Sequence, residues 1–591
     1  MPPPIPYASI SQTDGALSAQ PGDAVHAKAG VCSAGPLNTS TLVATKTALT
    51  STFGRGPLVE DVAYQLDVSG APVLVCRLNP GVAGAIGSVA RSGGGSPSAS
   101  VALDSGGTST AVAALAIASG VVLTRPLAVR LKVASGGSNL AATPTVRYSL
   151  DGGLTWSAAA TAVAGPTALG SSGLTLTWTD GSFVADDTWT GRAVPGAQQG
   201  TCTLAVTGTA TDAYRVALEI LRGGATLAAN TATYRLSLDG GETWGPETAM
   251  PVAGVVTPSG TGLTLTFTYS SGTGFTAGDR FDCATSAPGF TLSDLTSGWN
   301  ALLASTYDWE GLHVVGTVDS TIAAGADALA AAAIASYKPR WLLLSARDQT
   351  AEETEAAWIS ALQTEFASFV STLGRIFVAA GALDLVSTLS GRARRTSVAC
   401  TAAARAALAP ISEDLAWVGR GALPGVLRIH HDEASVPGLN ASRFITARTH
   451  EGRIGYYLTN PNGMVESGSD FELLQYRRVW DRAYRVLRRT LLPFLSQDLE
   501  VNPAGVPSPL VAGGIDEVDA GNIERKAVDA LEEALVKTTP RHATTAGATV
   551  DRTTNFLSTR DLSVAFTVQP KGYVKSINGT LGFVNPARTA Q

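Results

Sequence analysis

A short motif that occurs twice constrains the fold of this chain more than any other feature. The sequence SLDGGLTW at Ser149 to Trp156 recurs as SLDGGETW at Ser237 to Trp244. Collinear self-similarity of this kind indicates repeated structural units. Two further stretches recur in the same order: GLTLTW at Gly173 as GLTLTF at Gly262, and FVADDTW at Phe183 as FTAGDRF at Phe275.

The repeats lie in a region with an all-β pattern. From Ser92 to about Pro288 the chain is rich in Gly, Thr, Ser, Ala and Val, in short alternating runs separated by turn residues. We therefore predict two tandem inserted β-sandwich modules at 97–196 and 199–288, each near the ~100 residues common for such folds.

The repeated motif is an Asp-box pattern, and it has two possible meanings. As a structural hairpin, Asp151 and Asp239 accept backbone N–H bonds within the turn, while Trp156 and Trp244 pack beneath it. As a functional element, it indicates a glycan-binding or glycosidase protein. The structural interpretation is favoured, because only two copies occur and their spacing exceeds that of propeller blades.

The composition excludes several classes of protein. Of 591 residues, 45% are apolar and 15% are charged, and the formal net charge is -6, so intrinsic disorder is excluded. Direct binding to nucleic acid is not expected, because it requires a basic excess. Neither membrane insertion nor a secretory signal is expected from the hydropathy pattern. The five cysteines are odd in number and lack paired spacing, which favours reduced thiols: Cys32, Cys76, Cys202, Cys283 and Cys400.

Both ends of the chain are predicted to build one α/β (α+β) core around the inserted modules. Residues 1–90 would form an N-terminal arm and the first part of this core, and 291–560 the rest, because apolar runs alternate there with helical periods. Residues 561–591 are predicted to form a C-terminal β segment and arm. Strands are expected at 73–78, 312–318, 341–345, 376–380 and 562–568, and helices at 40–53, 322–337 and 350–373.

Two predicted helices near the end of the chain carry opposite charge. The helix at 469–496 would begin with a capping box of Ser469 and Glu472, and it is rich in arginine. The helix at 515–538 is acidic. These charges would pair either within a subunit or between copies of the chain. Candidates for intersubunit pairing are Arg477, Arg478, Arg482, Arg485, Arg489, Glu524, Glu532 and Glu533.

The sequence contains no recognisable catalytic motif. It lacks a phosphate-binding loop, a GxSxG elbow and a dinucleotide fingerprint. The cluster from His430 to Glu433 is interpreted as an ordinary polar turn in preference to a metal site, because it lacks the His spacing of a zinc helix. We therefore expect no enzyme activity, cofactor or metal.

Several segments, taken in order, resemble those of contractile tail sheath proteins of myophages and contractile injection systems. The resemblance covers roughly 1–90 and 291–591 and skips the β insert. Its segments are GPLN at Gly35, STFGRGPLVE at Ser51, GALPG at Gly421, RIGYYLTN at Arg453, GSDF at Gly468, RRVWDRA at Arg477 and LSVAFTVQP at Leu562.

The resemblance implies a structural subunit of a virion tail, assembled in the bacterial host cytoplasm. Such subunits stack as hexameric rings around an inner tube and contract to drive the tube through a target envelope. The implied partners are further copies of the chain, the tail tube protein, and baseplate and terminator proteins. Extended arms would add strands to neighbouring subunits. Candidate arm residues are Pro6, Tyr7, Ile10, Tyr573, Val574, Ile577, Leu581 and Phe583.

Overall fold

The chain folds into two compact units in a computed structural model. One unit comprises Met1–Val82, Gly289–Gly391 and Arg395–Gln591, and the other comprises Ala83–Pro288 with Arg392–Arg394. The first mixes helices and sheets and the second contains mainly strands, so the prediction of an α+β chain is confirmed. The structure describes residues 25–92, 98–118, 127–150, 153, 155–194, 202–224, 227, 231–269, 274–350, 353–506, 510–576 and 578.

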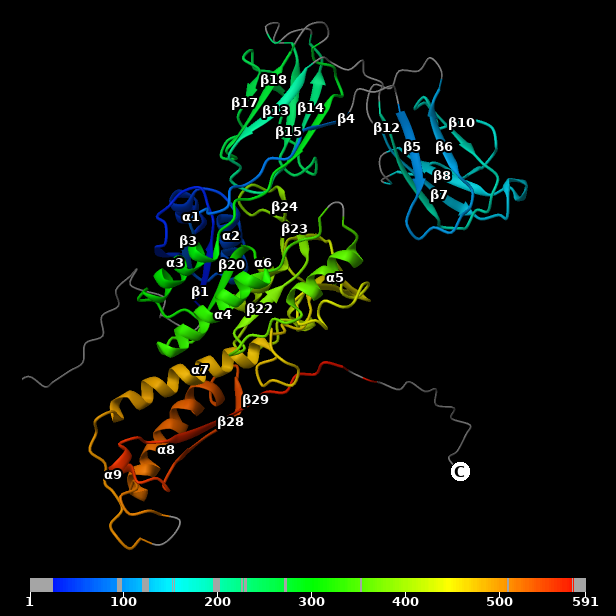
Figure 1. Ribbon diagram of the computed structural model, residues 1–591. Helices are drawn as coiled ribbons and strands as arrows, with labels where there is room; N and C mark the ends of the chain where they lie inside the picture. The colour runs from blue at the N-terminus through cyan, green and yellow to red at the C-terminus, as the bar shows by residue number, and fades with distance from the viewer. Residues whose placement is uncertain are drawn as a thin grey trace, which may run out of the picture. The chain divides into compact units, whose positions relative to one another are not determined.

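A six-stranded sheet forms the centre of the first unit (Figure 1). Its order is β2-β3-β1-β20-β21-β22, and every neighbouring pair is parallel except the antiparallel edge pair β2 and β3. Central parallel strands are covered on both faces, so they are almost uniformly apolar. The strands are β1 (His26–Gly30), β2 (Ser40–Val43), β3 (Val73–Arg77), β20 (Gly311–Thr317), β21 (Trp341–Ser345) and β22 (Ile376–Ala379).

Helices cover both faces of this sheet. Successive side chains of β21 point to opposite faces, and all of them are buried. Leu342 and Leu344 pack in one core with α3 (Leu292–Leu303), α4 (Ser320–Ala335) and α5 (Glu355–Phe366). Trp341 and Leu343 pack in a second core with α6 (Val398–Leu408). On that same side, α1 (Lys46–Phe53) and α2 (Pro57–Ser69) cover β3.

Two predicted helices are shorter in the structure. Residues 40–43 form β2, because Thr41 and Val43 pair with β3, and α1 begins only after Thr45, whose hydroxyl accepts the Ala48 N–H. Likewise α5 begins after Thr354, whose hydroxyl accepts the Ala357 N–H, and it ends at Phe366. In both cases a Thr inside the predicted span acts as the N-cap.

The second unit contains two modules with the same strand order. Module 1 has sheets β5-β12-β7-β8-β9 and β10-β11-β6, and module 2 has sheets β4-β19-β14-β15-β16 and β17-β18-β13. Each module has its own core. The strands of module 1 are β5 (Ser98–Leu103), β6 (Ala113–Ile117), β7 (Leu127–Ser135), β8 (Thr145–Ser149), β9 (Ala160–Thr161), β10 (Thr167–Ala168), β11 (Leu174–Trp178) and β12 (Thr188–Val194). Those of module 2 are β4 (Ala90–Ser92), β13 (Thr203–Gly208), β14 (Arg215–Arg222), β15 (Thr233–Ser237), β16 (Thr248–Ala249), β17 (Val255–Val256), β18 (Leu263–Thr268) and β19 (Arg280–Ala284).

The modules are nested, which corrects the predicted tandem arrangement. The first strand of module 2 is β4, which precedes module 1 in the chain and pairs with β19. Module 1 is therefore inserted between the first and second strands of module 2. The sequence repeats lie downstream of this junction, so they could not show it.

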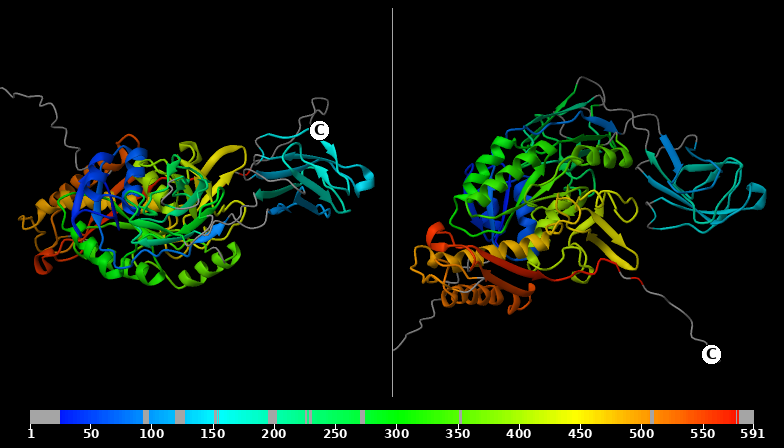
Figure 2. Two further views of the ribbon diagram at one scale, coloured as in Figure 1. Left: turned by 90° about the horizontal axis from the view of Figure 1, so that it is seen from above. Right: turned by 60° about the horizontal axis from the view of Figure 1, so that its bottom comes forward.

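The last part of the first unit follows a group of smaller strands. Its long helices are α7 (Leu474–Leu491) and α8 (Glu517–Leu531), and α8 continues into a π-helical turn at Glu532–Val536. Beside them lies the antiparallel hairpin of β28 (Ala543–Val550) and β29 (Val564–Pro570) (Figure 2). Of the helices described, none is long and apolar enough to cross a membrane. The smaller elements are β23 (Ala382–Val386), β24 (Ala393–Ser397), β25 (Val426–Ile429), β26 (Ala447–His450), β27 (Arg453–Leu458) and α9 (Phe556–Thr559).

Candidate assembly surfaces

Helix α7 begins later than the sequence predicts, and the predicted capping box is wrong. The N-cap is Leu473, with no side-chain cap. Leu473 is extended because it forms a β-bridge with Asn462, and the Leu474 N–H donates to the Pro461 carbonyl at 3.0 Å. Ser469 instead accepts the Phe471 N–H at 3.3 Å within the preceding turn.

Buried ion pairs join α7 to the rest of the first unit. The Arg478 guanidinium donates to both carboxylate oxygens of Glu310, at 2.7 and 3.0 Å, and both side chains are buried. Arg375 makes the same bidentate contact with Asp481, at 3.0 and 2.8 Å. Charge-assisted pairs of this geometry are strong and directional, so they fix the position of the helix.

The electrostatics of the Arg478–Glu310 pair favour the charged form of the carboxylate. Burial alone would raise the pKa of Glu310, but the nearby Arg478 guanidinium, together with the His26 ring nitrogen at 3.4 Å, holds this pKa well below its usual range. Burial lowers the pKa of Arg477 to about 9, and its guanidinium lies 3.5 Å from the centre of the Phe471 ring.

These contacts show which of the arginines that are candidates for pairing between subunits instead pair within their own subunit. Arg477 and Arg478 are buried within their own subunit, so intrachain pairing holds for them and they are not surface contacts. Arg482 and Arg485 are half-buried, and Arg485 lies 3.7 Å from Asp308. Arg489 is exposed near the end of α7 and remains a candidate for intersubunit pairing.

Two of the acidic candidates pair with basic groups close to α8. Glu524 accepts from Arg552 and from the Val550 N–H, both at 2.7 Å. Glu532 lies 2.8 Å from Lys537. These contacts tie α8 to the hairpin and to its own end. Glu533 is exposed in the same π-helical turn and remains a candidate for intersubunit pairing.

The hairpin of β28 and β29 is a two-stranded sheet in the part of the chain that the structure describes. Ala543 and Val550 of β28 are buried against α8 and its π-helical turn, whereas along β29 exposed positions alternate with half-buried ones. Isolated two-stranded ribbons are only marginally stable, and their outer edges present unpaired N–H and C=O groups. The hairpin is therefore a candidate acceptor for further strands.

The segment after β29 is held on its own subunit. The Tyr573 hydroxyl donates to the Ser412 carbonyl at 2.6 Å, and Lys575 contacts Asp414 and the Asn460 side chain. Tyr573 therefore anchors the chain within its subunit, contrary to its predicted role as a contact between subunits. Val574 is 79% exposed. The other predicted arm residues lie outside the described residues: Pro6, Tyr7, Ile10, Ile577, Leu581 and Phe583.

The Asp box of module 2 has the geometry of a structural turn. Asp239 accepts from the Ser237 hydroxyl at 2.6 Å and from both the N–H and the hydroxyl of Thr243, at 2.9 and 2.6 Å. Arg235 pairs with Glu219 and stacks 4.3 Å from the Trp244 ring. The side chains of this motif are thus occupied by one another. In module 1, Trp156 is partly exposed and Asp151 lies outside the described residues.

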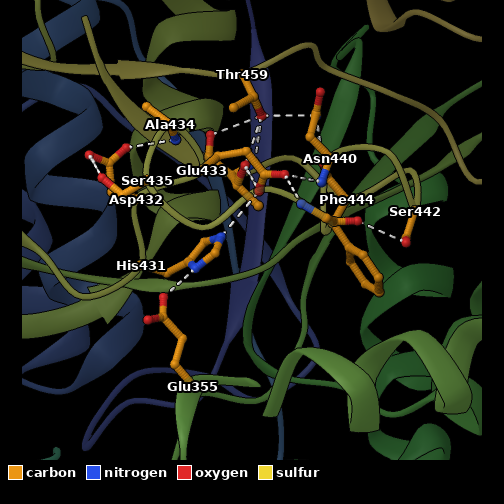
Figure 3. Close-up of polar contacts among 12 residues, drawn as sticks. Glu355, His431, Asp432, Glu433, Ala434, Ser435, Asn440, Ser442, Phe444 and Thr459 are labelled. Carbon is orange, nitrogen blue, oxygen red and sulfur yellow. Dashed lines mark hydrogen bonds and ion pairs between the residues drawn. The ribbon is translucent and has the colours of Figure 1, made fainter. Parts of the chain in front are cut away.

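The turn that begins at His430 forms a polar network that the sequence did not reveal in full (Figure 3). His431 is buried and lies 2.7 Å from Glu355 and 3.1 Å from Glu433. Glu433 also accepts from the Gly438 and Asn440 N–H groups. Burial alone would lower the pKa of His431, but the two carboxylates raise it above its usual value. Within the described residues, no group of three His, Cys, Asp or Glu side chains is placed to hold a metal ion.

Comparison with known proteins assigns the chain to a family. The model of the family described as DUF2586, N-terminal domain, matches residues 5–462, which is well over half of the sequence, so the chain belongs to this family. A comparison with curated proteins finds no match.

Solved structures that are similar to the chain include sheath proteins. A sheath tail protein from Desulfitobacterium hafniense has 10% identity and a TM-score of 0.38, with 96% of this chain and 100% of that chain covered. A sheath tail protein from Listeria innocua has 9% identity and a TM-score of 0.38, with 92% and 94% covered. The contracted sheath of an extracellular contractile injection system has 12% identity and a TM-score of 0.36, with 51% and 76% covered. TM-scores below 0.5 do not establish a common fold.

Proposed function

We propose that the chain is a structural, non-enzymatic subunit of a contractile tail sheath. It would polymerise as stacked rings around an inner tube and contract to drive the tube through a target envelope. The observation that carries this proposal is the β28–β29 hairpin, whose outer edges are open in the described part of the chain. A further strand from a neighbouring subunit would satisfy these edges by β-augmentation.

The chain beyond the hairpin is suited to donate a strand to a neighbouring subunit, just as the hairpin is suited to accept one. Tyr573 and Lys575 hold the start of this segment on its own subunit, and the following residues contain Ile577, Leu581 and Phe583. An anchor followed by an apolar, β-prone stretch is suited to reach an adjacent hairpin. The donated strand would then connect subunits while each subunit moves.

The buried ion pairs of α7 support movement of the first unit as a rigid body. Separating Arg478 from Glu310 would leave a charge buried without a partner, which is strongly unfavourable. Contraction would therefore rearrange contacts between subunits, and its energy would come from new burial between them. The tail tube, baseplate and terminator proteins are the partners that this function requires.

The alternative of a glycan-binding or glycosidase protein is less well supported. The Asp239 carboxylate and Arg235 are engaged within their own turn and sheet. Among the residues that the structure describes, no contact favours a sugar site on the modules.

Electron microscopy of the purified chain tests the proposal. Full-length protein should form rings or tubes, and a chain truncated after Ser576 should stay folded by circular dichroism without forming ordered polymers. A matched control replaces residues 577–591 with a Gly/Ser segment of equal length, which should also fail to polymerise. A strictly monomeric full-length chain over a wide concentration range would contradict the proposal.

A further inference from the structure

A mostly apolar cavity opens on the first unit. It has a volume of about 530 Å³, within the range of known ligand pockets. Tyr64 and Val68 of α2 line one side and Leu408 of α6 another, and a further wall is formed by Arg420, Ala422, Pro424 and Gly425.

Hydrogen bonds hold the walls of this cavity in place. The Tyr64 hydroxyl donates to the Pro424 carbonyl at 2.9 Å, and Arg405 donates to the carbonyls of Gly421 and Ala422 at 2.9 and 3.2 Å. Both Tyr64 and Arg405 are buried. The cavity is thus preformed, which lowers the entropic cost of binding.

Exposed apolar side chains lie beside the cavity. Leu408, on its wall, is 40% exposed, and Trp417, over which the lining residue Arg420 lies, is 55% exposed. Ile454 is 97% exposed, and the next residue, Gly455, approaches the lining residue Ala422. An apolar pocket beside exposed aromatic and aliphatic groups is typical of a site that binds an extended peptide.

The sequence PPPIPY at Pro2 to Tyr7 has the chemistry to occupy this site. Its four prolines lack an N–H group, so this stretch cannot form the regular ladder of a donated strand. Proline-rich segments instead favour the polyproline II conformation and bind aromatic-lined grooves. The residues between Tyr7 and Val25 could span at most roughly 60 Å, which permits contact with an adjacent molecule.

We infer that the cavity lined by Tyr64, Leu408 and Arg420 binds the Pro2–Tyr7 segment of a second copy of this chain in a polyproline II conformation. This inference rests on the proposed function for the presence of the second copy. It assigns the N-terminal segment a mode of recognition different from that of the C-terminal arm, because one inserts proline rings and the other pairs backbone groups.

Peptide binding tests this inference without relying on polymers. The probe is a fluorescent peptide with the sequence of residues 1–11, and the receptor is the full-length chain with Pro2, Pro3, Pro4 and Pro6 changed to Ala. Fluorescence anisotropy should show saturable binding. A peptide with the same four prolines changed to Ala should bind at least tenfold more weakly.

Receptor variants locate the site. Leu408→Arg should weaken binding at least tenfold, whereas Leu495→Arg, at a 72% exposed position elsewhere on this unit, should not change it. Trp417→Ala provides a second variant, because its exposed side chain can be removed without disturbing a core. Absence of saturable binding, or equal binding to all three variants, would overturn the inference.

Two further comparisons separate the possible failures. Unsubstituted chain, diluted until it is monomeric, should bind the peptide as tightly as the proline-substituted chain does. If the unsubstituted monomer does not bind the peptide, its own Pro2–Tyr7 segment occupies the cavity. That result would overturn donation by a second copy. Peptide binding without polymers in electron micrographs would contradict the sheath proposal alone. Polymers without peptide binding would overturn this inference alone.

Discussion

The guanidinium of Arg478 is buried where α7 meets the residue just before β20. It is 2% exposed and is satisfied by Glu310 and by the Ala409 carbonyl. Burying two charges is costly, and their attraction compensates for this cost only with good geometry. The pair therefore favours one position of α7 over others more than it adds net stability.

Substitutions at the Arg478–Glu310 pair should show that breaking the pair is costly, whereas replacing both charges is not. Arg478→Met should destabilise the first unit by about 3–5 kcal/mol, because Glu310 is left buried and unpaired. The double variant Arg478→Met, Glu310→Leu should recover most of that loss. Arg489→Met, at an exposed position of the same helix, serves as the control and should change stability by less than ~0.5 kcal/mol. Urea denaturation measures these effects, and a single variant no worse than the control would contradict the argument.

His431 predicts a dependence of stability on pH. Burial opposes the charged imidazole, but Glu433 and Glu355 raise its pKa above the ordinary value of 6.5. Its contribution to stability is therefore complete below pH 6.5 and is lost as the pH rises through the raised value of the folded state. Thermal unfolding from pH 6 to pH 9 should show this loss, and His431→Gln should remove it. His430→Gln is the control and should retain it.

At the scale of elements, the sequence predicted the central strands well and the ends of helices poorly. The strand at 341–345 agrees with β21, because a short apolar run between helices has few alternatives in an α/β layer. The start of α7 was wrong because the bridge between Leu473 and Asn462 overrides the local capping pattern. Pairs such as Arg478 with Glu310 and His431 with Glu355 join distant parts of the chain, and no local pattern reveals them.

The packing of the hairpin depends on the π-helical turn that follows α8. Leu535 is fully buried in a small core with Val479, Ala483 and Ala543. Leu535→Ala should therefore destabilise the hairpin by ~2–5 kcal/mol, as expected for a buried leucine. Hydrogen exchange of the β28 and β29 amides should accelerate in this variant. Val518→Ala, at a 70% exposed position of α8, is the control, and equal exchange in both variants would contradict this packing.

At the scale of the whole molecule, the nested modules define which part can be removed. In module 1 a short loop connects β5 to β6, and the equivalent strands of module 2 are β4 and β13. Deletion of residues 95–200, with β4 joined to β13 by the module 1 loop of residues 104–112, should leave module 2 folded. Thermal unfolding followed by circular dichroism tests this expectation.

The matched control for this deletion removes residues 90–92 as well. That chain lacks the edge strand β4, so β19 would lose this partner and the transition should fall to a lower temperature. If both deletions unfold alike, the pairing of β4 with β19 contributes nothing to module 2.

The nesting of module 1 also sets an order of events on the ribosome. Residues 90–92 of β4 are synthesised before all of module 1, but their partner in β19 follows roughly 190 residues later, a delay of roughly 10–40 seconds at ~5–20 residues per second. Module 1 can complete its own core during this interval, while module 2 waits for its last strand. The outer module is thus the last to close, although its first strand is made first.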